Sequence, residues 1–224
     1  MANRRRWQKE VTKSTGSKII GADQGLVTCL SLSDGQVTKT CIHGHDLHSI
    51  IKKMGNKKKG SKGFKRAQDH RTNYINWAIN QLDLTDIKEF RLEKLFQMRS
   101  GQNVGKALSN WTYTQINAKV MSRCEELGVP VIEQSATYRS QRCSGCGWTH
   151  KKNRTGKAFI CTSCGMKHDA DINGASNHAI DLYQLPKLFW QKKMNINGFY
   201  WLETGIYNSI DQAPTVPDVA NNKM

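Results

Sequence analysis

The sequence predicts an α/β protein built on one mixed β-sheet, and three observations lead to this prediction. Residues 18–40 alternate apolar stretches with turn residues, which is typical of consecutive short strands. Two further strand patterns, over 87–95 and 129–133, each follow a helical pattern. Two CxxC motifs then precede a last helix expected at about 171–183. Strands that alternate with helices favour a layered α/β architecture.

The individual elements follow from local patterns. The first strand ends at Asp23, and two more strands flank the tight turn 33–35, which completes a three-stranded meander. Apolar residues at helical spacing predict helices over 66–82 and 112–127, the second of which Gly128 ends. The strand over 87–95 carries more charged residues than a central strand usually does.

The charge of the chain indicates its partner. Lys and Arg number 34 against 18 Asp and Glu, a net charge of +16, and the acids and bases of residues 181–224 cancel. Such an excess favours a polyanion, with nucleic acid as the default. The hydrophobic fraction of 38% is too high for a disordered basic tail, and no apolar run approaches the ~20 residues that span a bilayer. Without a secretory signal or a membrane segment, we expect a cytoplasmic protein.

Residues 52–66 concentrate this charge, with eight basic residues, three glycines and no acid. We expect a loop that joins two helices. Its function stays open between contact with phosphates and simple solvation of a charged run. The candidate nucleic-acid contacts here are Lys57, Lys58, Lys59, Lys62, Lys65 and Arg66.

The CxxC pairs predict a zinc ribbon. They are separated by 14 residues, and each is followed by a glycine that supplies the positive φ of a knuckle turn. Four thiolates leave no open coordination position, so one structural zinc ion is expected, with a redox dithiol as the alternative. The intervening tip is basic, and is either a nucleic-acid contact or merely a hydrophilic turn. The zinc ligands would be Cys143, Cys146, Cys161 and Cys164. The candidate nucleic-acid contacts in and before the ribbon are Arg139, Arg142, Lys151, Lys152 and Arg154. The other three cysteines, Cys29, Cys41 and Cys124, are expected in the core.

Three acidic residues occur at informative positions. Asp23 ends the first strand, Glu93 lies in a later strand, and Asp171 opens the last helix. Taken singly, they could be a turn aspartate, a solvent-facing residue and a helix N-terminal charge. Their order agrees with an RNase H-type fold, in which such positions gather hard oxygen ligands for Mg²⁺ or Mn²⁺.

Four segments together resemble a known family: GADQG at 21–25, LEKL at 92–95, YRSQRCSGCG at 138–147 and CTSCGMKHDADINGASN at 161–177. Over residues 17–184 the chain is similar to the RuvC-like nuclease half of TnpB proteins and type V CRISPR effectors. The resemblance implies an RNase H-like (RuvC) mixed sheet with an inserted zinc ribbon. It also implies that Asp23, Glu93 and Asp171 are catalytic and hold two Mg²⁺ or Mn²⁺ ions, with Glu89 and Asp169 as fallback candidates.

The expected organisation follows from this resemblance. It comprises a basic N-terminal arm (1–16), a nuclease core with the first two motifs (17–137), the zinc ribbon (138–167), the helix of the third motif (168–184) and an aromatic tail (185–224) that includes Trp190. The chain departs from the family pattern in two ways. Fewer than 20 residues precede the first motif, where members of the family usually carry an RNA-binding lobe. In addition, Ala170 stands where the family often has arginine, and Gly174 where it usually has alanine. Neither substitution removes a metal ligand.

The function expected is therefore that of a metal-dependent DNA endonuclease, prokaryotic or phage-encoded and associated with the nucleoid. Because the chain shows no lobe for a guide–target duplex, we expect a guide RNA, a partner protein subunit or both, and a homodimer is conceivable. Two alternatives stay open: a guide-independent nuclease for branched DNA, and a nucleic-acid-binding regulator that does not cleave.

Overall fold

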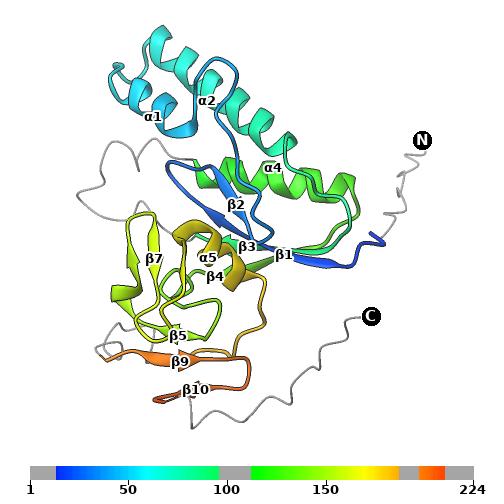
Figure 1. The fold of residues 1–224 in the computed structure, drawn as a ribbon. Coiled ribbons are helices and arrows are strands. Elements are labelled where there is room, and N and C mark those ends of the chain that lie inside the picture. Colours follow the sequence, from blue (N-terminus) through cyan, green and yellow to red (C-terminus); the bar gives the residue numbers. More distant parts are fainter. Residues whose placement is uncertain (1–13, 96–111, 187–196, 210–224) are drawn as a thin grey trace.

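The computed structural model describes residues 14–95, 112–186 and 197–209 (Figure 1). Within these ranges no helix combines the length and the apolar composition needed to cross a bilayer. The helices are α1 (Leu47–Gly55), α2 (Lys62–Asn80), α4 (Tyr113–Glu126) and α5 (Ala170–His178), with a 3₁₀ turn η1 (Lys151–Asn153). The strands are β1 (Lys18–Gln24), β2 (Leu30–Leu32), β3 (Ile87–Lys94), β4 (Val131–Ser135), β5 (Trp148–Thr149), β6 (Arg154–Thr155), β7 (Ala158–Ile160), β8 (Lys167–Asp169), β9 (Phe199–Trp201) and β10 (Ile206–Tyr207).

The main sheet is mixed, as predicted, with strand order β2-β1-β3-β4. β1 runs antiparallel to β2 and parallel to β3, and β3 runs parallel to β4. Ala22 of β1 lies opposite Leu92 of β3. The next residues, Asp23 and Glu93, are the last but one of two neighbouring parallel strands and therefore lie at the same edge of the sheet.

The two faces of this sheet differ in chemistry because side chains alternate along each strand. Ile20, Ala22, Phe90 and Leu92 are buried in the apolar core that α1, α2 and α4 complete. The opposite face is covered by α5 (Figure 1). A Cβ atom on Gly21 would lie 2.1 Å from a backbone oxygen of α5, so only glycine permits this close packing.

The expected elements are present, with differences in length. The third strand of the meander is reduced to a single bridge between Ser31 and Val37, whose side chain is exposed and adds little to the core. The basic run 52–66 does join two helices, but the loop itself spans only 56–61. Cys29 and Cys124 are buried as predicted, whereas Cys41 is half-buried in the loop before α1.

The last helix ends at His178, five residues earlier than expected. Carbonyl groups in and just after its final turn accept hydrogen bonds from arginine side chains instead of continuing the helix: Arg139 donates to the carbonyl of Asn177, and Arg91 to that of Ala179. The sequence pattern did not reveal these donors because they lie far away along the chain.

The aromatic tail docks on the ribbon. β9 pairs antiparallel with β5, so that Tyr200 lies opposite Trp148, with ring centroids 4.9 Å apart. Phe199 and Trp201 are buried beside Leu185 in a small cluster of their own. Trp190 lies outside the described residues.

Candidate functional site

The four predicted zinc ligands converge. Cys143, Cys146, Cys161 and Cys164 place one sulfur atom each within 4.8 Å of the others. The Sγ atoms of Cys143 and Cys164 are 3.8 Å apart, and those of Cys146 and Cys161 are 3.6 Å apart. Tetrahedral coordination with Zn–S bonds of about 2.3 Å places sulfur atoms about 3.8 Å apart. The cluster therefore has the dimensions of a zinc site.

The local geometry explains this convergence. The glycine after each CxxC pair has positive φ, 80° at Gly147 and 75° at Gly165, as the knuckle turns require. Backbone amides also donate to the sulfur atoms, for example that of Cys164 to Cys161. The hydrogen bond between the Cys143 and Cys146 side chains lowers the pKa of Cys143 and raises that of Cys146, as expected of two thiols that share one proton.

The ribbon is anchored directly to α5. The Asn173 side chain accepts from the backbone N–H of Ser144 at 3.0 Å and donates to the carbonyl of Arg142 at 2.8 Å. Asn177 donates to the same carbonyl at 2.7 Å. These hydrogen bonds fix the position of the ribbon relative to α5, the helix that carries Asp171.

Two of the three predicted carboxylates lie in direct contact. Asp23 and Glu93 share a side-chain hydrogen bond at the edge of the sheet. Burial raises both pKa values, that of Glu93 to about 7, and the neighbouring negative charges of Glu93 and Asp171 further raise that of Asp23. No ion pair to Asp23 or Glu93 is formed within the described ranges. This pair of acids, Asp23 buried and Glu93 half-buried, therefore favours a bound cation or a bound proton.

The third carboxylate, Asp171, opens α5 but is engaged elsewhere. Arg154 donates to its Oδ1 at 3.0 Å, and the ammonium group of Lys157 contacts its Oδ2. Both cations come from the hairpin of the ribbon, and Lys157 also donates to Thr28, beyond the end of β1. The ribbon hairpin thus lies over the edge of the sheet that carries Asp23 and Glu93, here called the acidic edge. Its two cations partly neutralise the negative charge there. Lys157 was not among the predicted site residues.

A histidine joins Asp23 and Glu93, and the sequence analysis missed it. One nitrogen of His178 lies within 4.8 Å of a carboxylate oxygen of each acid. Its side chain is 1% exposed, and burial together with the charge of Arg139 lowers its pKa to about 3. The signal was available, because His178 follows Asp171 by seven residues, which is two helical turns on one face.

The fallback candidates have other roles. Glu89 lies four residues before Glu93, about 13 Å along the strand, and pairs with Arg91 at 2.5 Å. Asp169 is the N-cap of α5, where it accepts from the backbone N–H groups of Asp171 and Ile172.

Two predicted nucleic-acid contacts are wrong, because Arg139 and Arg142 are buried at 7% and 4% exposure. Arg139 donates to the carbonyl of Ser135 and covers the ring of Trp201. Arg142 donates to the Trp201 carbonyl at 2.7 Å and to Asn177 Oδ1 at 2.6 Å. These side chains join α5, the ribbon and the tail. The remaining candidates are exposed or half-exposed: Lys57, Lys58, Lys59, Lys62, Lys65, Arg66, Lys151, Lys152 and Arg154.

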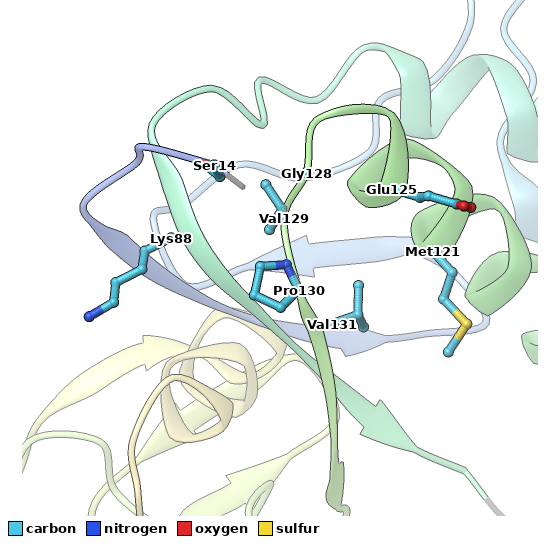
Figure 2. A pocket seen from close by; sticks show the side chains of 8 residues that line it. All are labelled: Ser14, Lys88, Met121, Glu125, Gly128, Val129, Pro130 and Val131. Atoms are coloured by element: carbon cyan, nitrogen blue, oxygen red, sulfur yellow. The ribbon is translucent and has the colours of Figure 1, made fainter. Parts of the chain in front are cut away.

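A pocket of about 830 Å³ lies away from this chemistry, between α4 and the segment that leads into β4 (Figure 2). Met121, Val129, Pro130 and Val131 form its apolar lining, and Figure 2 shows Lys88 pointing away from it. The described residues that line it include no cluster of catalytic groups, so the acidic edge is the candidate active site.

Comparisons with known proteins find similarity to type V CRISPR effector nucleases. Residues 113–178, from the start of α4 to the end of α5, match the family model of the Cas12f1-like TNB domain. The resemblance to type V effectors that the motifs predict is thereby confirmed.

Two curated relatives carry the same name, CRISPR-associated endodeoxyribonuclease Cas12f1. The protein of Sulfoacidibacillus thermotolerans is 33% identical over 139 residues, 61% of this chain and 32% of the relative. That of Syntrophomonas palmitatica is 29% identical over 123 residues, 54% of this chain and 24% of the relative. The chain thus spans a third or less of the curated relatives that it matches.

A solved structure of Cas12f1 with sgRNA and target DNA shares the fold. The similarity has a TM-score of 0.55 at 21% identity and covers 75% of this chain and 51% of the other.

Proposed function

We propose that this chain is the nuclease portion of an RNA-guided, type V DNA endonuclease with an RNase H-like (RuvC) core. The observation that carries the proposal is the position of Asp23 and Glu93, which touch at the ends of two parallel neighbouring strands. Asp171 opens the helix that covers this edge, and its charge acts on both acids. The relatives support the reaction class, because they are named endodeoxyribonucleases.

The residues fit a centre for divalent metal ions. Hard carboxylate oxygens suit Mg²⁺ and Mn²⁺, and two neighbouring acids that form no ion pair with any residue the structure describes favour a dication. Divalent ions bound there would supply the Lewis acid that activates water and stabilises the leaving oxygen in phosphodiester hydrolysis. Asp23, Glu93 and Asp171 would hold them. Arg154 and Lys157, which contact Asp171, are placed to bind the substrate phosphate beside it.

The four cysteines have a structural part in this proposal. Zinc held by Cys143, Cys146, Cys161 and Cys164 would fix the knuckles to which Asn173 is hydrogen-bonded. The orientation of α5, and with it the position of Asp171, would then depend on the metal.

Guide and target are the partners we propose, since the structural relative is a complex with sgRNA and target DNA. The exposed lysines of the 56–61 loop and of the ribbon tip would contact their phosphates. The test is to purify the chain from its host, sequence the nucleic acid that accompanies it, and assay DNA matching that RNA for cleavage. The proposal expects one RNA species and cleavage that EDTA abolishes. Cleavage of branched DNA without RNA, or no cleavage with any divalent ion, would contradict it.

A further inference from the structure

His178 lies at the acidic edge, and no hydrogen bond of its Nδ1 atom explains why a histidine is buried there. Its Nδ1 atom is fully enclosed and has no hydrogen-bond partner among the described residues. A buried polar atom left unpaired destabilises the fold, so a partner absent from the protein itself is expected for it. An apolar side chain of similar size would fill the same space without that cost.

The backbone directs this side chain at the two acids. His178 closes the face of α5 that packs on β1, where the carbonyl carbon of His178 lies 2.7 Å from the Cβ position of Gly21. Side chains on a helix point towards its N-terminus, here towards Asp23, which lies beside Gly174. The result is the compact group of Asp23, Glu93 and His178, whose candidate ligand atoms all lie within 4.8 Å of one another.

The nearby cations do not satisfy this group. Arg154 and Lys157 pair with Asp171, and Arg139 faces the backbone of α5 and the Trp201 ring. An imidazole nitrogen beside two carboxylates is a donor set for a metal ion.

We propose that His178 is a direct ligand of a metal ion bound by Asp23 and Glu93, which gives one position of the active site a nitrogen ligand. This inference rests on the proposed nuclease site and adds a selectivity to it. A nitrogen donor adds more to the binding of a first-row transition ion than to that of Mg²⁺, and Mn²⁺ gains the least of that series. The nitrogen ligand therefore shifts the selectivity of the site from Mg²⁺ towards Mn²⁺.

The experiment uses the full chain with its zinc and measures Mn²⁺ without any turnover. Electron–nuclear double resonance of the protein with one Mn²⁺ per chain reports nitrogen bound directly to manganese. We expect a directly bound nitrogen whose signal changes when histidine is labelled with the heavy nitrogen isotope. This measurement needs no substitution, so it does not depend on whether a variant folds.

Substitutions identify which residue supplies the nitrogen atom bound to Mn²⁺. We expect His178→Gln to abolish the nitrogen coupling and to raise the dissociation constant for Mn²⁺ at least about tenfold, with a change below about threefold for Mg²⁺. The matched control is His168→Gln, an exposed histidine on β8, which should change neither value. Asp23→Asn should also remove the coupling, because the nitrogen signal belongs to the carboxylate site and not to a surface histidine.

The outcomes separate this inference from the proposed function. Mn²⁺ that binds at Asp23 without a nitrogen coupling would overturn the role of His178 and leave the nuclease proposal intact. A coupling that survives His178→Gln would overturn the assignment as well. Absence of any Mn²⁺ or Mg²⁺ binding that depends on Asp23 would overturn both.

Discussion

Glu93→Gln should make the metal-free protein more stable at pH 8, although it removes a candidate catalytic group. The pKa of Glu93 in the folded chain is about 7, against 4.5 for an ordinary glutamate. Its ionised form therefore destabilises the fold, and wild-type stability falls as the pH rises from about 4.5 to 7. A difference of one in pKa corresponds to about 1.4 kcal/mol, so the penalty at pH 8 amounts to about 3 kcal/mol.

Glutamine has nearly the same shape but carries no charge, so the variant avoids this penalty. For a chain of this size, the gain corresponds to a rise in melting temperature of roughly 6–12 °C at pH 8, which should vanish near pH 4.5. A saturating divalent ion should reverse the order if Glu93 is a metal ligand as proposed, because the variant would lose that ligand.

The assay is thermal unfolding monitored by circular dichroism at pH 4.5 and pH 8. Each measurement is made first with EDTA at a concentration low enough to leave zinc bound, and then with Mn²⁺ added. Glu89→Gln is the matched control, because its carboxylate pairs with the buried Arg91. That variant should be destabilised at pH 8 with and without Mn²⁺. A Glu93→Gln protein that is less stable than wild type in metal-free buffer at pH 8 would refute the reasoning.

The remaining predictions concern the metal module and the basic surface. Purified protein should contain one zinc per chain, and Cys161→Ser should lose it and melt at a lower temperature, because a structural zinc site contributes folding free energy; unchanged metal content by mass spectrometry would contradict this. Replacement of Lys57, Lys58 and Lys59 by alanine should lower the slope of log K against log salt for DNA or RNA binding by up to about 3, roughly one for each phosphate contact. An unchanged slope would identify the loop as a solvated charge run.

Short-range patterns in the sequence were enough to predict most of the helices and strands of the fold. Helical periodicity and Gly128 predicted α4, and the spacing of the cysteines predicted the cluster that the structure shows. The knuckle glycines were readable because positive φ leaves few other residues possible. These signals are short-range, and they depend on residues that lie close together in the sequence.

The parts that escaped prediction depend on long-range packing. Arg139 and Arg142 look like surface charges in the sequence, yet the tail strand β9 and the end of α5 enclose them. His178 is the exception, since it lies two turns after Asp171 on the same helix and only its imidazole sets it apart from a pattern of carboxylates. Lys157 was missed because nothing local shows that a hairpin residue reaches the end of β1.

Cleavage by matched variants tests most directly whether the proposed site, at the edge of the sheet where Asp23 and Glu93 lie, cuts DNA. End-labelled target DNA is incubated with the RNA-containing complex in Mg²⁺ or Mn²⁺, and binding is measured in parallel. Asp23→Ala, Glu93→Ala and Asp171→Ala should each lower the cleavage rate by several orders of magnitude while binding persists, because each removes a metal ligand. Glu89→Ala should retain cleavage. Full activity of Glu93→Ala with loss of activity in Glu89→Ala would contradict the site described for this chain, and so would cleavage that survives Asp23→Ala.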